Sequence, residues 1–280
     1  MDTKQVLSSI TSNTKAVFLT HAQGFNGLTD ELINELDAKG VPLIEDVCES
    51  HGAMHNEKKA GSFGLISNFS FFYAHHMSTI EGGMICTNDN KIYQQARMLR
   101  SHGMVREAND ATIKENYYKE NPSLHPDFIF AFPAYNVRNT EIGGIMGLSQ
   151  LKRLDENIER RTKNLHRFLD QLNSKIYRTD FKLEGSSNYA FNLILKEPDD
   201  LLVLKLMKKM KSSDLEFRRG SAGGGNQTRQ PYLKDIVPNN HYKSFPETEH
   251  VHFYGFYIGN FPDLKSEEID DICRILNSVE

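Results

Sequence analysis

Short apolar runs alternate with amphipathic segments along the first part of the chain, and this alternation restricts the possible folds more than any other feature. Apolar character and turn-like flanks predict buried strands at residues 16–21, 41–47, 68–73 and 83–87. Leucine, isoleucine and alanine at helical spacing, each series followed by a glycine, predict helices at 30–39 and 91–101. Buried strands that alternate with helices predict an α/β layer with a largely parallel sheet.

The rest of the chain predicts a second, smaller domain. Apolar residues recur at helical spacing from Ile142 to Leu172, which predicts one long helix connecting the two domains. Further strands are predicted near 189–195 and 252–258, and further helices near 199–210 and 266–277. We therefore expect a large α/β domain over residues 1–150 and a small α+β domain over 151–280. Residues 104–133, with three prolines and several aromatics, predict a long functional loop.

Composition narrows the classes of function. The 280 residues have a formal net charge of -4, so no basic field favours a nucleic-acid partner. No apolar stretch reaches the length of a membrane span, and the N-terminus lacks the apolar core of a signal peptide. The three scattered cysteines, Cys48, Cys86 and Cys273, indicate a reducing compartment rather than a disulfide framework. We expect a cytoplasmic protein without a bound metal.

Five short motifs follow one another in a fixed order. They are Ile44 to Ala53 (Ile-Glu-Asp-Val-Cys-Glu-Ser-His-Gly-Ala), Gly61-Ser62-Phe63-Gly64, Ser70 to Gly83, Arg100-Ser101-His102-Gly103 and Tyr135 to Glu141. In this order they resemble the DegT/DnrJ/EryC1/StrS family of nucleotide-sugar aminotransferases. The pair His75-His76 and the segment from Glu216 to Gln227 resemble the sugar 3-dehydratase branch of that family.

The residue that decides which chemistry the resemblance implies is His75. In the family, the frame Ser-x4-Lys-x5-Glu-Gly-Gly contains the lysine that bonds covalently to pyridoxal phosphate (PLP). Here Ser70 and Glu81-Gly82-Gly83 keep the frame, and His75 stands at the lysine position. An imidazole cannot form that bond but can move protons. A lone histidine in an apolar strand is usually a core residue, and only its place in this frame predicts a catalytic base.

The resemblance implies a dehydratase that works with PLP and pyridoxamine phosphate (PMP). Glutamate would donate the amino group, and the enzyme would remove the C3 hydroxyl of a nucleotide-linked 4-keto-6-deoxy sugar, with GDP-4-keto-6-deoxymannose as the expected substrate. The products serve dideoxysugar and lipopolysaccharide biosynthesis. The family's relatives that use an iron–sulfur cluster are excluded, since such a cluster normally needs four cysteine ligands and the chain has three.

Four residues match cofactor-binding positions of the family. Asp46, at the end of a predicted strand, would pair with the pyridinium nitrogen, although such an aspartate can simply cap a helix. Glu49 would lie near the phenolic oxygen, or would be a solvated acid at a helix start. Ser70 would bind the cofactor phosphate, and Asn136 would reach the phosphate of a neighbouring subunit's site in a homodimer.

Three arginines match substrate-binding positions. Arg106 and Arg138 would bind the carboxylates of glutamate, because a guanidinium can pair with a carboxylate through two hydrogen bonds. Arg219, with Arg218 and the run Gly223-Gly224-Gly225, would form an anion-binding loop for the nucleotide pyrophosphate. Surface cations and a flexible turn are the competing interpretations of these residues.

The implied fold is the fold-type I, aspartate aminotransferase-like fold of PLP enzymes. The resemblance also implies about a hundred further residues before the first strand, within usual domain sizes, which would supply the loop that holds the cofactor phosphate. Three alternatives therefore stay open. One is an ordinary sugar aminotransferase, disfavoured because residues 68–90 contain no lysine. The others are an inactive fragment or binding module, and a half-enzyme completed by a separately encoded N-terminal piece.

Overall fold

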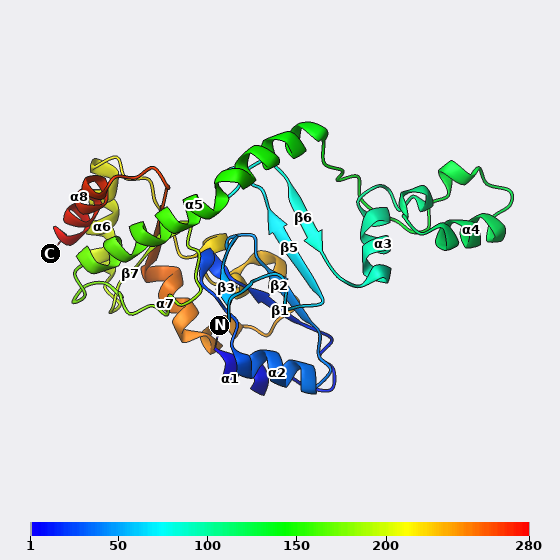
Figure 1. Ribbon diagram of the computed structural model, residues 1–280. Helices are drawn as coiled ribbons and strands as arrows, with labels where there is room; N and C mark the ends of the chain where they lie inside the picture. The colour runs from blue at the N-terminus through cyan, green and yellow to red at the C-terminus, as the bar shows by residue number, and fades with distance from the viewer. Residues whose placement is uncertain (1, 280) are drawn as a thin grey trace. The chain divides into compact units, whose positions relative to one another are not determined.

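The computed structural model describes residues 2–279 and contains two compact units (Figure 1). Unit 1 comprises Met1–Thr20, Leu28–Cys48 and Gly61–Lys152. Unit 2 comprises His21–Gly27, Glu49–Ala60 and Arg153–Glu280. Each unit has its own sheet and its own hydrophobic core.

Unit 1 is built on a four-stranded sheet with the order β1-β2-β5-β6. The strands are β1 (Val17–Thr20), β2 (Leu43–Asp46), β5 (Ile66–Ser70) and β6 (Gly83–Cys86). The pairs β1–β2 and β2–β5 are parallel, and β6 joins the edge of β5 in the antiparallel sense. The prediction of a largely parallel sheet is confirmed, with each strand within about two residues of its expected start.

Helices α1 (Thr3–Ser8) and α2 (Asp30–Ala38) cover the β1–β2 side of this sheet. The Thr29 hydroxyl caps α2 by accepting the Leu32 backbone N–H at 3.1 Å, which satisfies one of the free donors of its first turn. Buried leucines from β1, α2, β2 and the loop before α2 form the core of unit 1, and side chains of α1 pack against it: Leu19, Leu28, Leu32, Leu36 and Leu43, with Val6 and Leu7 from α1. Helix α3 (Asn90–Leu99) follows β6 and matches the predicted helix.

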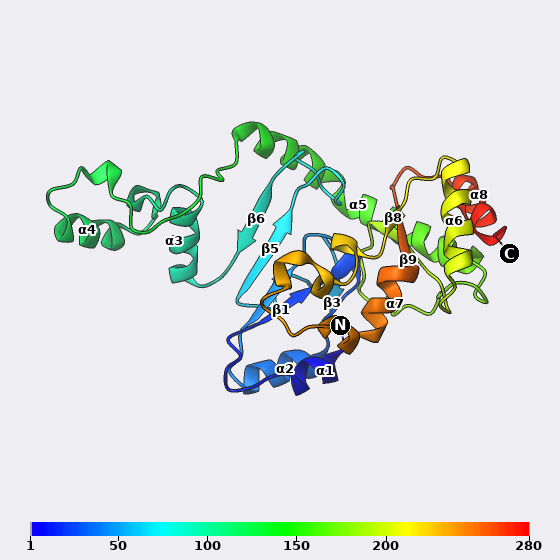
Figure 2. The same ribbon diagram turned by 180° about the vertical axis from the view of Figure 1, so that it is seen from behind.

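The segment 104–133 contains a helix that the sequence did not predict. Helix α4 (Ala111–Glu120) is capped by Asp110, whose carboxylate accepts the Thr112 N–H at 2.8 Å. In both views α4 lies on the far side of α3 from the sheet (Figures 1 and 2). It buries no residue and has only weak amphipathic character, so its sequence lacks the apolar periodicity from which a helix can be predicted. The prediction of a long loop was therefore wrong in this part.

Unit 2 has a three-stranded antiparallel sheet with the order β7-β9-β8. Its strands are β7 (Ala190–Ile194), β8 (Arg218–Arg219) and β9 (Gly255–Gly259), and β3 (Met54–His55) pairs separately with β4 (Lys58–Lys59). Its helices are α6 (Asp200–Ser212), α7 (Pro246–Tyr254) and α8 (Ser266–Asn277), together with the C-terminal part of α5 (Glu141–Gln171). The predicted helices at 142–172, 199–210 and 266–277 are confirmed. The predicted strand at 252–258 begins only at Gly255, because residues up to Tyr254 form the last turn of α7.

Aromatic packing holds the core of unit 2 together. The rings of Phe168 on α5 and Phe191 on β7 stack with centroids 4.4 Å apart. Buried Tyr177 donates its hydroxyl to the Leu276 carbonyl at 2.7 Å, so burial leaves its polar atom satisfied. Among residues 2–279, none of the helices combines the length and the apolarity needed to cross a bilayer.

A buried carboxylate organises the segment that leads into β5. Glu45 is 0% exposed, and its side chain accepts the backbone N–H groups of Gly61 at 2.7 Å, Phe63 at 2.8 Å and Gly64 at 2.7 Å. Gly61 has φ +89°, and a Cβ at this position would lie 2.7 Å from the Phe69 ring. The Gly-Ser-Phe-Gly motif thus closes around an ionised side chain that would otherwise be costly to bury.

We predict that Glu45→Gln lowers the free energy of unfolding by roughly 2–4 kcal/mol, because the amide removes the charge and places N–H groups against backbone donors. Chemical denaturation with two spectroscopic probes measures this loss. The matched control is Glu35→Gln, which removes only an exposed pair with Lys39 at 3.1 Å and should cost less than about 0.5 kcal/mol. Equal effects of the two substitutions would contradict the organising role of Glu45.

Candidate active site

The carboxyl ends of β2 and β5 bring polar residues together in unit 1. Asp46 is the last residue of β2, and its partner in the parallel register is Asn68 on β5. The Asp46 Oδ1 atom accepts the Asn68 side-chain N–H at 2.9 Å and the Cys48 backbone N–H at 3.1 Å. Ligands of open α/β sheets bind at this edge. The prediction that Asp46 ends a strand is therefore confirmed.

The chain turns back on itself directly after β5. Ser70 ends the strand, and its hydroxyl accepts the Phe72 N–H at 3.3 Å. The backbone N–H of His75 donates to the Phe72 carbonyl at 3.0 Å, and the His75 ring meets the Phe72 ring edge-on with centroids 5.7 Å apart. Two backbone hydrogen bonds of 2.9 Å, from Phe71 to Gly82 and from Thr79 to Phe71, close the turn. His75 is thus half-buried on a defined loop.

The surroundings of His75 favour its neutral form. Burial lowers the pKa of the imidazole below its ordinary value, and this desolvation outweighs two opposing effects. These are a hydrogen bond with the Ser70 backbone and the negative charge of Asp46, both of which raise the pKa. A neutral imidazole at pH 7 can accept a proton, which is the chemistry expected of a general base.

We predict that the His75 imidazole titrates below its ordinary pKa of about 6.5, as measured by NMR of its ring protons. The unfolded chain then binds the proton more tightly than the folded one. The free energy of unfolding should therefore fall as the pH drops below about 6.5 and level off below the folded-state pKa. His75→Asn should flatten this part of the stability profile. A midpoint at or above 6.5 in the folded protein would contradict the desolvation argument.

Ile80 sits in a strained conformation in the same turn. Its φ is +70°, in the left-handed region that a β-branched residue rarely adopts, and 62% of its surface is exposed. We predict that Ile80→Asn raises the melting temperature by stabilising the fold by about 1 kcal/mol, because asparagine adopts this conformation more easily. Little apolar burial is lost at such an exposed position. Scanning calorimetry of the two proteins tests this, and a lower melting temperature for the variant would show that the Ile80 side chain itself stabilises the turn.

Glu49 belongs to unit 2, where two donors fix its carboxylate. The Gln23 backbone N–H donates to Oε2 at 2.7 Å, and the Tyr189 hydroxyl donates to Oε1 at 3.0 Å. Burial and the adjacent Glu49 charge both raise the pKa of Tyr189, so its hydroxyl keeps its proton and acts as a donor. The interpretation of Glu49 as a freely solvated acid does not fit this geometry. No motif along the chain pointed to Gln23 or Tyr189, which are 26 and 140 residues from Glu49.

The candidate substrate residues of unit 1 lie on other segments. Arg106 is in a 3₁₀ turn, with its Nε atom 3.7 Å from a Glu107 carboxylate oxygen and its guanidinium 5.7 Å from the centre of the Phe128 ring. Asn136 and Arg138 are exposed on the segment that leads to α5, where Asn136 forms a β-bridge with Ser101. One chain therefore presents Asn136 and Arg138 at its surface.

Arg219 lies on β8 in unit 2. Its guanidinium donates to the Phe253 carbonyl at 2.8 Å and lies 5.9 Å from the centre of the Phe256 ring, while most of the side chain stays exposed. In the glycine run, Gly225 has φ +98°, and a Cβ there would come within 2.6 Å of the His252 ring. Close packing against α7 thus explains at least this glycine without a ligand.

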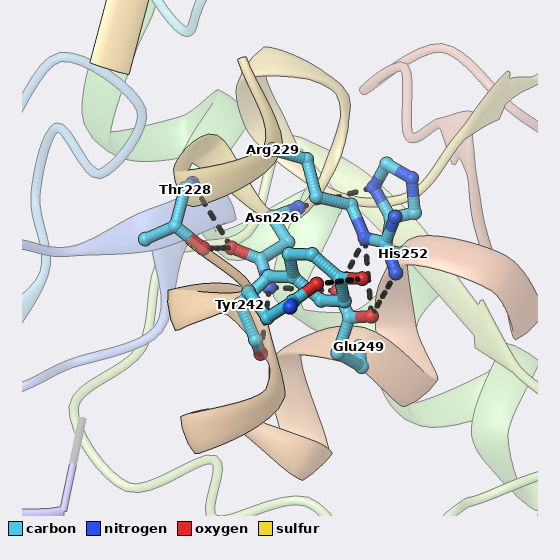
Figure 3. Close-up of polar contacts among 7 residues, drawn as sticks. Asn226, Thr228, Arg229, Tyr242, Glu249 and His252 are labelled. Carbon is cyan, nitrogen blue, oxygen red and sulfur yellow. Dashed lines mark hydrogen bonds and ion pairs between the residues drawn. The ribbon is translucent and has the colours of Figure 1, made fainter. Parts of the chain in front are cut away.

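A polar cluster fixes the segment that follows the glycine run (Figure 3). The Arg229 guanidinium forms a two-pronged ion pair with Glu249 on α7, and it stacks on the Tyr242 ring at 3.8 Å. Asn226 donates its side-chain N–H to Glu249 at 2.7 Å and its backbone N–H to the His252 ring at 3.2 Å. These contacts lower the pKa of Glu249 and raise that of Arg229. The segment is therefore held to α7 rather than left as a flexible turn.

The residues at the end of the unit 1 sheet fit a pyridoxal cofactor. Asp46 offers a carboxylate at the strand ends, Ser70 offers a hydroxyl one strand away, and His75 offers a neutral imidazole under the influence of the Asp46 charge. A carboxylate is the partner that a protonated pyridine nitrogen requires. None of residues 68–90 is a lysine, so this loop has no amine for a covalent bond to the aldehyde.

The fold and this site define an aminotransferase-like protein of the PLP-dependent class. The chain matches the model of the DegT/DnrJ/EryC1/StrS aminotransferase family over residues 1–277, and it belongs to that family. A GDP-4-keto-6-deoxy-D-mannose 3-dehydratase from Escherichia coli O55:H7 is 32% identical over 279 residues, which are 99% of this chain and 71% of that enzyme.

Solved structures of such dehydratases share the fold. GDP-4-keto-6-deoxymannose-3-dehydratase with a trapped PLP-glutamate geminal diamine matches with a TM-score of 0.83 and 31% identity, over 99% of this chain and 71% of that one. A histidine-to-asparagine variant of the same enzyme, with bound GDP-perosamine, matches with a TM-score of 0.83 and 30% identity, again over 99% and 71% of the two chains. The expected family and the expected fold class are both confirmed.

Proposed function

We propose that this protein is a PLP/PMP-dependent 3-dehydratase that removes the C3 hydroxyl of GDP-4-keto-6-deoxymannose, with glutamate as amino donor. The observation that carries the proposal is the position of His75: its half-buried imidazole stands at the lysine position of the family's frame, where burial lowers its pKa below the ordinary value. The similarity to the E. coli dehydratase supports the choice of sugar. The PLP-glutamate adduct held by a related enzyme supports the choice of amino donor.

The proposed roles follow from the chemistry of each side chain. When bound, the cofactor would supply an electron sink at its ring. Asp46 keeps the ring nitrogen protonated, Ser70 donates its hydroxyl to the phosphate, and Glu49 sets the hydrogen bonding at the phenolic oxygen. His75 would move the proton at C4′ of the cofactor, and that proton would accompany the C3 hydroxyl of the sugar as it leaves as water.

The remaining assignments belong to the same proposal. Arg106 and Arg138 bind the glutamate carboxylates, and Arg219 binds the pyrophosphate of the nucleotide. Exposed Asn136 reaches the cofactor phosphate of a second subunit in a homodimer. In this scheme residues 1–150 carry the cofactor and residues 151–280 form the smaller domain.

The reaction itself tests the proposal. The protein is incubated with PLP, glutamate and GDP-4-keto-6-deoxymannose, and NMR follows the 3-deoxy sugar while enzymatic assays follow 2-oxoglutarate and ammonia. We predict turnover by the natural chain and a loss of about 10²–10⁴-fold on His75→Asn, the usual contribution of a general base. The control His166→Asn changes an exposed histidine on α5 and should leave turnover intact.

Two other outcomes would overturn the proposal. An amino sugar formed without loss of the C3 oxygen would identify an aminotransferase. A cofactor-sized adduct on a lysine in the neighbourhood of the peptide 68–90, after borohydride reduction of the PLP-treated protein, would show that the site has a covalent amine after all. His75→Lys should create such an adduct on the peptide 68–90 and abolish elimination.

A further inference from the structure

Both donors that reach the Asp46 side chain bind the same oxygen. Asn68 Nδ2 and the Cys48 backbone N–H converge on Oδ1, at 2.9 and 3.1 Å. Within residues 2–279, no hydrogen bond of the chain goes to Oδ2 of this carboxylate. Two donors on one oxygen fix the plane of a carboxylate and leave the other oxygen able to accept a bond from a ligand.

The Asn68 amide has only one productive orientation. Its Nδ2 atom donates one hydrogen to Asp46 and the other to the Cys48 sulfur at 3.1 Å. A flipped amide would turn its carbonyl oxygen toward a carboxylate that can only accept, so the flip is excluded. The backbone pairs Asn68 with Asp46 across the parallel strands, which places the two side chains next to each other at the same end of the sheet.

From this geometry we infer that Asn68 is a positioning residue for Asp46: it orients the carboxylate so that its second oxygen meets the ring nitrogen of the cofactor. The inference rests on the proposed function, because it needs a pyridine ring to be bound at Asp46. Asn68 itself touches neither cofactor nor substrate in this scheme. Asn68 acts on the cofactor only through its hydrogen bond to Asp46. Removing the Asn68 side chain should therefore weaken cofactor binding although no direct contact between protein and cofactor is lost.

A purely structural role is the competing interpretation, because Asn68 also ties β5 to β2. The strand offers a matched control for that role. Ser67, the preceding residue, donates its hydroxyl to the Gly61 carbonyl at 2.7 Å and makes no side-chain bond to Asp46. Ser67→Ala removes a buried hydrogen bond of the same strand and leaves the orientation of Asp46 untouched.

The test measures the affinity of the full chain for PLP, by titration followed through the absorption of the bound cofactor. Asn68→Ala should weaken binding about tenfold, which corresponds to the loss of one hydrogen bond to a charged group. It should also alter the pH dependence of the absorption, since the protonation of the ring depends on Asp46. Asn68→Asp keeps the shape but removes the donors, so it should weaken binding at least as much. Ser67→Ala should leave both the affinity and the spectrum unchanged.

A double-mutant cycle on the stability of the cofactor-free protein provides a second measurement. Asp46→Ala and Asn68→Ala together should lower the free energy of unfolding by less than the sum of their separate effects, because both remove the same hydrogen bond. Additive effects, or an equal loss of PLP affinity in Ser67→Ala, would overturn the inference. An Asn68→Ala variant that binds PLP with the affinity of the natural chain would also overturn the inference. A natural chain that binds no PLP would overturn the proposed function together with this inference, whereas unchanged binding by the variant overturns the inference alone.

Discussion

The buried Glu45 carboxylate and the three backbone amides around it determine where the site of unit 1 can form. The amides belong to the segment that leads directly into β5, so satisfying this one carboxylate helps to hold the start of β5 beside β2. This pairing sets the register that brings Asn68 next to Asp46 and starts the His75 turn at Ser70. A side chain that contacts no ligand in the proposed function thus places the residues that do.

Much of the fold could be predicted because hydrophobic periodicity is a local property. The strands of unit 1 and helices α5, α6 and α8 all carry apolar residues at regular spacing, and all were predicted within a few residues. Helix α4 was missed because it buries nothing, so its sequence carries no such pattern. The end of α7 was taken for a strand because aromatic residues run on from Phe253 and Tyr254 into β9 without a polar break.

The candidate site was predictable only in part, for a different reason. Asp46, Ser70 and His75 lie in motifs whose spacing is visible along the chain. The residues that orient acidic groups, Asn68 for Asp46 and Tyr189 for Glu49, are brought to them by tertiary contacts. Asn68 stands at the start of the predicted strand 68–73, so pairing the carboxyl ends of the two predicted strands would not have found it; only the observed register of β2 and β5 makes it the neighbour of Asp46. Tyr189, 140 residues from Glu49, gave no signal along the chain either.

The left-handed Ile80 means that the turn carrying His75 is locally frustrated: its sequence and its backbone disagree. A conformation that costs roughly 1–2 kcal/mol persists only because the surrounding hydrogen bonds impose it. The energy needed to open this loop is therefore smaller than its closed hydrogen-bond pattern suggests. The proposed base therefore lies on a loop whose closed conformation is already strained, and releasing this strain would offset part of the energy needed to open the loop.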